Sequence, residues 1–244
     1  MWRHIGIVTA AWVVLTTVLE MVVANVNIYP VAASEEANLI DEAFQTLMYL
    51  AIPVFTLVVV IIVYSLLRFR GRGPADEGSP FRRNTGVAIA WLTITAGLSI
   101  FVIFNPGLTG LKELASHPAA QLEIQVEAEQ WHWNVSYPQY GVYIEEAEEM
   151  FLPAGQAVRV ELTSTDVIHS FWVPAFRLKQ DAVPGQVNNL YFTPNRIGNF
   201  DEDFMYRVQC AELCGTGHAR MRMRLAVVEP ENFEEWIAQI KAEQ

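Results

Sequence analysis

The sequence is poor in the features that would assign it to several common protein classes. It has 2 cysteines in 244 residues, which is too few for a disulfide-rich scaffold. It has no internal repeat, and its formal net charge of −11 makes nucleic acid an unsuitable partner. Only 18% of its residues are charged, whereas 52% are hydrophobic. This hydrophobic content is high for an acidic soluble protein and indicates membrane segments.

Two long apolar runs predict a transmembrane helical hairpin. Phe44 to Leu67 and Val87 to Phe104 carry no charge, and each is long enough to cross a bilayer. The stretch between them contains five arginines, namely Arg68, Arg70, Arg72, Arg82 and Arg83. Because basic loops stay on the cytoplasmic side, both outer ends of the hairpin, and residues 105–244, should lie on the opposite side.

A third apolar run, Ile5 to Ile28, is interrupted only by Glu20. It fits either a signal peptide cleaved near Val31-Ala32-Ala33 or a retained first helix. We favour the retained helix, because the distance from the apolar core to that site is long for cleavage. A carboxylate within a span can mark a functional site, but we interpret Glu20 as lying near the outer interface, where it reaches water.

The remainder of the chain has the pattern of a β domain. Hydrophobic residues alternate with polar ones at Leu122–Ala128 and Val158–Leu162, as in strands with one wet face. Further strands are expected at 187–193, 204–209 and 222–228, separated by Pro and Gly signals. Several short strands with such separators predict an antiparallel sandwich. Pro230 to Lys241 predicts a terminal amphipathic helix.

These patterns predict a membrane-anchored all-β protein. The hairpin and an additional first helix form the membrane part, and a β-sandwich follows. We divide the chain into residues 1–33 (signal-like or retained first helix), 34–106 (hairpin with its Arg-rich cytoplasmic loop), 107–229 (β domain) and 230–244 (C-terminal helix). Asn105-Pro106-Gly107 is expected to break the second helix of the hairpin.

The most informative motif contains both cysteines. Cys210 and Cys214 are followed by His218 and Met221, and His169 lies upstream. Thiolates, imidazoles and a thioether are soft ligands that select copper over magnesium or calcium, and this combination is typical of cupredoxin electron-transfer sites. One such site needs a single cysteine, so the second cysteine permits two copper ions bridged by both sulfurs.

The competing interpretation is a Cys210–Cys214 disulfide in an exported domain. A loop this short would be strained and would add little stability, because closing few residues removes little chain entropy. Gly215 and Gly217 permit the tight turn of a loop wrapped around a metal. We therefore favour copper.

These residues resemble subunit II of the haem–copper cytochrome c oxidases. The pattern Cys210-x-Glu212-x-Cys214-Gly215-x-x-His218-x-x-Met221 is similar to that family's dinuclear copper A motif. The segments at 166–171 and 178–185, and the hairpin followed by a cupredoxin domain, are similar too. The resemblance covers about residues 40–240 and implies a cupredoxin-like Greek-key β-sandwich.

The resemblance also implies roles for single residues. Cys210 and Cys214 would bridge the two coppers. His169 would bind one copper and His218 the other. Met221 would bind one of the coppers through its sulfur, and the backbone carbonyl of Glu212 would bind the other. The Glu212 side chain would help bind a magnesium or manganese ion shared with subunit I. Trp131 matches the tryptophan at which electrons enter.

The implied function is that of the electron-accepting subunit of a proton-translocating terminal cytochrome c oxidase in a bacterial plasma membrane. It would be multi-pass, with the copper domain on the outer side, and would take electrons from cytochrome c or a small blue-copper protein and pass them to haem in subunit I. One alternative is the copper A subunit of a related nitric oxide reductase. Another is a non-redox sensor or assembly module with a Cys210–Cys214 disulfide.

Overall fold

The computed structural model describes residues 2–71, 73 and 84–244, and the chain forms two compact units. The helical unit contains residues up to Ile28 together with Glu42–Leu111, and the sandwich unit contains Tyr29–Asp41 and Lys112–Gln244. Arg72, Arg82 and Arg83 of the predicted cytoplasmic loop lie outside the described residues.

Long apolar helices supply the membrane part, as predicted. Helices α1 (Trp2–Asn25) and α2 (Glu35–Arg68) have mean hydropathies of 2.1 and 2.8 over their most apolar windows. Helix α3 (Thr85–Val102) continues through the π-helical segment η1 (Ile103–Leu108) into α4 (Thr109–Ala115). The most apolar window of this stretch has a mean hydropathy of 2.3. All three are long and apolar enough to cross a membrane.

The predicted break at Asn105-Pro106-Gly107 takes the form of a kink between two helical stretches. Asn105 leaves the helical region (φ −139°, ψ 116°), since Pro106 cannot donate a backbone hydrogen bond. The Thr109 hydroxyl contacts Asn105 Oδ1 at 3.3 Å and the Pro106 carbonyl at 3.4 Å, and the helix resumes as α4. The helical backbone is therefore interrupted at the predicted position, and the chain then continues as a helix.

Polar side chains join α1 to α2 within the helical unit. Trp12 Nε1 donates to the Pro53 carbonyl at 2.8 Å, and the Thr16 and Thr56 hydroxyls lie 2.7 Å apart. In apolar surroundings such hydrogen bonds favour helix association, because each unmade bond would leave a polar group without water.

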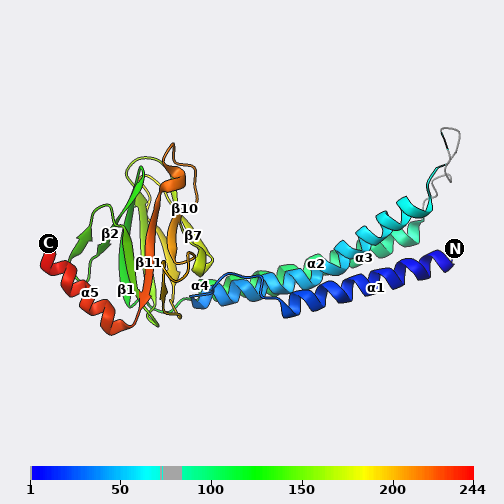
Figure 1. The fold of residues 1–244 in the computed structure, drawn as a ribbon, viewed down its shortest axis with the longest axis horizontal. Helices are drawn as coiled ribbons and strands as arrows, with labels where there is room; N and C mark the ends of the chain where they lie inside the picture. Colours follow the sequence, from blue (N-terminus) through cyan, green and yellow to red (C-terminus); the bar gives the residue numbers. More distant parts are fainter. Residues whose placement is uncertain (1, 72, 74–83) are drawn as a thin grey trace. The chain divides into compact units, whose positions relative to one another are not determined.

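The sandwich unit consists of two packed sheets (Figure 1). The five-stranded sheet has the order β3 (Val142–Ile144), β2 (His132–Tyr137), β1 (Leu122–Glu129), β5 (Val158–Ser164), β8 (Asn188–Phe192). The other sheet has the order β4 (Glu149–Pro153), β11 (Arg222–Val228), β10 (Arg207–Cys210), β6 (His169–Val173), β7 (Leu178–Ala182), and β9 (Gly198–Asn199) pairs with β11. The predicted membrane-anchored sandwich is confirmed.

The expectation of an antiparallel sandwich holds for most strand pairs, but two pairs are parallel, so both sheets are mixed. β1 pairs in parallel with β5, and β11 pairs in parallel with β4. Strand alternation in a sequence gives the face of each residue but not the direction of the neighbouring strand. The parallel pairs arise because the chain visits other strands between the two partners.

The core lies between the sheets and extends under the last helix. Its largest fully buried side chains include Trp133, Tyr137, Phe171 and Phe176. Helix α5 (Pro230–Glu243) inserts Phe233 and Ile237 into the core. Burial of each such side chain contributes about 1.5–3 kcal/mol, so the sandwich is rigid enough to hold a site at one end.

The segment preceding α2 is part of the sandwich unit. The guanidinium of Arg177 donates to both carboxylate oxygens of Asp41 at 2.9 Å, and to the carbonyls of Pro30, Val31 and Pro174 at 2.7–2.8 Å. These contacts use all five N–H donors of the side chain. They fix the linker and the first turns of α2 to the loop after β6.

Candidate metal centre

Three adjacent strands of one sheet bring the predicted ligands together. His169 opens β6, Cys210 ends β10, and Met221 immediately precedes β11. The backbone N–H of Cys210 donates to the Met221 carbonyl at 3.0 Å, which closes the intervening segment into a loop. We call Cys210–Met221 the ligand loop; it contains the short helix η3 (His218–Arg220).

Five predicted ligand side chains converge at this end of the sandwich. The two cysteine sulfurs lie 3.7 Å apart. His169 Nδ1 lies 3.1 Å from Met221 Sδ and 4.0 Å from Cys210 Sγ. Cys214 Sγ lies 3.6 Å from His218 Nδ1 and 3.8 Å from Met221 Sδ. The thiols and His169 are close enough to share a metal ion.

Both cysteines are free and buried. Burial, followed by the hydrogen bond and charge of Cys210, raises the pKa of Cys214 to about 12. Without a metal this sulfur therefore keeps its proton, and metal binding would displace it. Two sulfurs, a thioether and two imidazole nitrogens around one buried point form a soft donor set, so the site fits copper.

Asp166 orients His169, a role that sequence reasoning did not assign. Its Oδ1 lies 2.8 Å from His169 Nε2, so Nε2 carries the proton and the Nδ1 lone pair faces the sulfurs. Burial raises the pKa of Asp166, but hydrogen bonds from His169, Val167 N–H and Gln130 N–H outweigh it and leave the pKa below its ordinary value. The sequence feature that could have indicated this role is an acidic residue three positions before the histidine.

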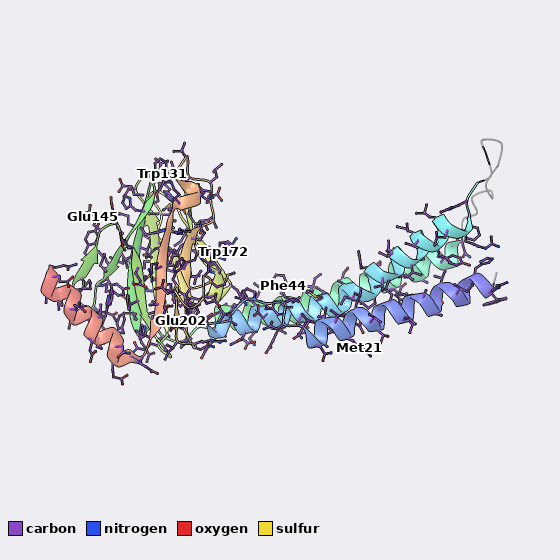
Figure 2. All side chains as sticks on the ribbon, in the orientation of Figure 1. Met21, Phe44, Trp131, Glu145, Trp172 and Glu202 are labelled. Carbon is purple, nitrogen blue, oxygen red and sulfur yellow. The ribbon has the colours of Figure 1, made fainter. Side chains whose placement is uncertain are left out.

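Gln130 and Trp131 attach to the same ligand loop. Gln130 Nε2 and Trp131 Nε1 both donate to the Cys214 carbonyl, at 2.7 and 3.0 Å. The Gln130 backbone N–H donates to Asp166 at 2.8 Å. The turn between β1 and β2 thus contacts the cysteine loop and, through Asp166, the histidine strand. Trp131 is 38% exposed and lies at the end of the sandwich that carries η3 (Figure 2).

The two loop glycines have different roles. Gly215 has φ +110°, a conformation that side chains rarely adopt, as expected for a tight turn. Gly217 has an ordinary φ of −88°, but a Cβ there would lie 2.2 Å from Trp131 Cδ2. Gly217 is thus required by the indole that packs on it, rather than by the turn.

Glu212 and Trp133 occupy different environments. The Glu212 carbonyl lies 3.2 Å from Cys210 Sγ, while its residue is exposed to solvent. Trp133 is buried and packs edge-on against Phe171, with ring centroids 5.7 Å apart. Trp133 is therefore a core residue, whereas Trp131 is the half-exposed aromatic of this pair.

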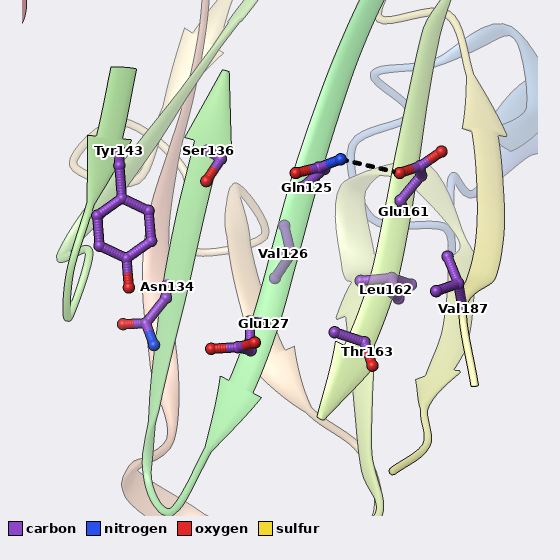
Figure 3. Close-up of a pocket in the computed structure, with 10 residues that line it drawn as sticks. All are labelled: Gln125, Val126, Glu127, Asn134, Ser136, Tyr143, Glu161, Leu162, Thr163 and Val187. Atoms are coloured by element: carbon purple, nitrogen blue, oxygen red, sulfur yellow. Dashed lines mark hydrogen bonds between the residues drawn. The ribbon is translucent and has the colours of Figure 1, made fainter. Parts of the chain in front are cut away.

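The outer face of the five-stranded sheet carries an acidic depression of about 280 Å³ beside the hairpin that holds Trp131. Gln125, Glu127, Asn134, Tyr143 and Glu161 are among the residues that line it (Figure 3). Burial, and then the charges of Glu145, Glu127 and Glu129, raise the pKa of Tyr143. The face therefore has a negative potential.

The chain is similar to several known proteins. Residues 142–228 match the family described as cytochrome c oxidase subunit II, periplasmic domain. Cytochrome c oxidase subunit 2 of Thermostichus vulcanus is 31% identical, over 95% of this chain and 84% of that protein. Cytochrome c oxidase subunit 2 of Synechocystis is 29% identical, over 93% of this chain and 80% of that protein. The periplasmic domain of subunit II of cytochrome oxidase of Bradyrhizobium japonicum is 33% identical in the aligned part, which covers 52% of this chain and 97% of that structure with a TM-score of 0.45.

Proposed function

Because the chain belongs to the cytochrome c oxidase subunit II family, we propose that it receives electrons from a soluble donor at a dinuclear copper A centre and passes them to haem in subunit I for the reduction of oxygen to water. The chain is a subunit of a cytochrome c oxidase, and catalysis resides in the complex. The observation that carries the proposal is the convergence of both thiols, His169, His218 and Met221 at one end of the sandwich.

The chain's own residues would hold the metals as follows. Cys210 and Cys214 supply sulfurs close enough to be shared by two ions, with His169 beside the Cys210 sulfur and His218 beside the Cys214 sulfur. Met221 and the Glu212 carbonyl complete the set. When bound, the copper pair would take up and release one electron at a time. The packed sheet behind His169 and Cys210 keeps the ligands in place in both oxidation states.

Trp131 is the proposed point at which electrons enter. Its ring is partly exposed, and its Nε1 donates to the carbonyl of a ligand residue, Cys214, at 3.0 Å. One hydrogen bond and the backbone and side chain of Cys214 therefore connect the protein surface to the ligand sulfurs. Among the described residues, no other exposed tryptophan has a hydrogen bond of its indole to the ligand loop.

The acidic face beside Trp131 favours a cationic donor such as a basic cytochrome c. Glu127 and Glu129 lie on the β1–β2 hairpin whose turn carries Trp131. Opposite charges on the two proteins would steer the encounter and raise its rate at low salt. A small blue-copper protein with a basic surface would use the same contacts.

Two further parts of the proposal depend on the surroundings of the chain. The sandwich unit would lie on the outer side of a bacterial plasma membrane, since the arginines of the hairpin segment favour the cytoplasm. A magnesium or manganese ion at Glu212 stays a prediction of the resemblance. Its other ligands would have to come from subunit I, because the described residues that could hold a metal together are His169, Cys210 and Cys214.

The proposal is tested by stopped-flow oxidation of reduced cytochrome c by the assembled oxidase. We expect the second-order rate constant to fall steeply as ionic strength rises. Glu127→Gln and Glu129→Gln should lower it at low salt, whereas Glu243→Gln at the far end of α5 should not. A rate constant that is independent of both salt and these substitutions contradicts the proposed donor site.

A further inference from the structure

Two helix ends of the helical unit carry cations without carboxylates. In residues 2–18 of α1 and 57–71 at the end of α2, the only Lys, Arg, Asp or Glu residues are Arg3, Arg68 and Arg70. None of these arginines forms an ion pair with another described residue. Arg68 and Arg70 belong to the stretch predicted to lie on the cytoplasmic side, where anionic lipids give the membrane surface a negative potential. Their charges are thus not neutralised within the described part of the helical unit.

Helices α1 and α2 run antiparallel, so the start of α1 lies beside the end of α2 (Figure 1). His4 Nδ1 lies 2.6 Å from the Tyr64 hydroxyl oxygen, and Trp12 Nε1 donates to the Pro53 carbonyl at 2.8 Å. Four partly buried positions of α1 are spaced four residues apart and so share one face of the helix, namely His4, Val8, Trp12 and Thr16. Polar groups that lose such partners in lipid find no water, so these contacts hold the two helix ends together.

A depression of about 250 Å³ lies between α1 and α2 at these ends. His4, Tyr64 and Phe69 line the part nearest the helix ends, and their rings contact one another with centroids 5.6–6.2 Å apart. Val8 and Ile61 line it about one turn further along the helices. The lining therefore changes from polar aromatic to aliphatic along the helix axis, which is also the order from the headgroup of a lipid to its acyl chains.

Two arginines border the polar end of this depression. Arg3 adjoins His4, and Arg68 lies one turn beyond Tyr64 at an (i, i+4) position, on the same side of α2. Both arginines are exposed. Arginine side chains at the end of a membrane helix extend to the membrane surface, while their methylene stems lie along apolar groups. The polar end of the depression therefore has a positive potential.

We propose that this depression binds one anionic phospholipid of the cytoplasmic leaflet, with its phosphate at Arg3 and Arg68 and an acyl chain along Val8 and Ile61. A guanidinium binds a phosphate through two parallel hydrogen bonds, and basic pockets between membrane helices are a common setting for headgroup recognition. Phosphatidylcholine also carries a phosphate, but its ammonium group cancels the net charge and is repelled by the arginines. The site needs α1 in the mature chain, but it depends on neither the copper ligands nor the electron donor.

Native mass spectrometry of the assembled oxidase tests this site. The complex is released from nanodiscs that contain equal amounts of phosphatidylglycerol and phosphatidylcholine, and the lipids that stay bound are identified by mass. We expect one bound phosphatidylglycerol whose occupancy falls about fivefold in Arg68→Gln, the effect of one cation near an anionic membrane surface. Arg70→Gln is the matched control, because Arg70 Nε donates to the Leu66 carbonyl of its own helix at 3.2 Å. No phosphatidylglycerol that responds to Arg68→Gln, or an equal loss in both variants, overturns the proposal.

A steric substitution gives an independent measurement. Ile5 lines the depression and is 49% exposed, so Ile5→Trp should fill the depression without disturbing the hydrogen bonds between α1 and α2. Ile7 is similarly exposed, at 44%, but does not line the depression, so Ile7→Trp is the control. We expect Ile5→Trp to lower the occupancy of the same lipid at least as much as Arg68→Gln does. Occupancy equal to that of the Ile7 variant contradicts the site.

The same spectra give the mass of this chain and separate the two proposals. A mature chain that begins after residue 33 lacks Arg3 and His4, and would overturn the lipid site outright. Two coppers per chain, with no lipid that responds to the variants, would reject the lipid site alone. A responsive lipid in a chain without copper would reject the metal centre alone. The copper content of each variant distinguishes a lost lipid from a lost fold.

Discussion

A Cβ atom at Gly217 would lie 2.2 Å from Cδ2 and 2.4 Å from Cγ of Trp131, so the indole rests directly on the backbone of the ligand loop. This contact would determine where the exposed end of the proposed electron path lies. It also links a glycine of the metal-binding motif to a residue of a different sheet.

Gly217→Ala should move the Trp131 ring while leaving the five ligand side chains in place. We expect electron transfer from the donor to slow by about a hundredfold, the scale of loss produced by displacing a reacting group by 1 Å. Copper content and the visible spectrum should stay unchanged. Thr216→Ala, at an exposed position of the same loop, is the control. An unchanged rate in the Gly217 variant would show that the ring position is not limiting.

Trp131→Phe keeps an aromatic ring but removes the Nε1 donor to the Cys214 carbonyl. The rate of donor oxidation should fall, because the hydrogen-bonded route to the ligand residue is lost, and metal content should be retained. Phe204→Leu, at another exposed aromatic of the sandwich unit outside the acidic face, should have no such effect. Stopped-flow rates at fixed ionic strength check both variants, and equal losses would contradict a specific role for Trp131.

Asp166→Asn should weaken copper binding through His169. An amide can donate or accept at Nε2, so the imidazole loses the partner that fixes its tautomer. Such outer partners typically account for a 10–100-fold change in metal affinity. Competition with a copper chelator measures the effect, and Asp181→Asn, which lies on β7 of the same sheet, is the control. Affinity equal to that of the control would mean that the ligand loop alone orients His169.

Arg177→Gln tests the clamp that fixes the linker to the sandwich. Arg177 and Asp41 are mostly buried, with side chains 13% and 18% exposed, so loss of the guanidinium leaves a carboxylate and three carbonyls without their donor. We expect a loss of about 1–3 kcal/mol in unfolding free energy and faster proteolysis within residues 29–34. Arg159→Gln, on the partly exposed outer face, should leave the unfolding free energy nearly unchanged, because exposed ion pairs contribute little to stability. An Arg177→Gln variant as stable and as protease-resistant as that control would contradict the clamp.

The sequence was sufficient for the features that depend on local pattern. Alternation at Leu122–Ala128 and Val158–Leu162 gave β1 and β5, and the spacing of Cys210, Cys214, His218 and Met221 identified the loop that the structure folds around one point. The length of the apolar runs alone was enough to predict the membrane helices. These predictions succeed because hydrophobic periodicity and ligand spacing depend only on residues that are close together in the sequence.

Features that depend on distant partners were not predictable. The parallel pairing of β1 with β5 is set by the order of strands in space, which alternation does not encode. The need for glycine at position 217 arises from an indole 86 positions earlier in the chain. Arg177 was an unremarked residue of a loop, because its partners Asp41 and Pro30 lie more than 130 residues away.

Copper stoichiometry combined with electron paramagnetic resonance of the native, full-length chain in its complex tests the central claim most directly. The ligand set predicts two copper ions per chain, reduced Cys210 and Cys214, and a one-electron signal whose hyperfine splitting is shared equally by two copper nuclei. A single copper with the splitting of one nucleus, or a Cys210–Cys214 disulfide in the active native protein, would contradict it.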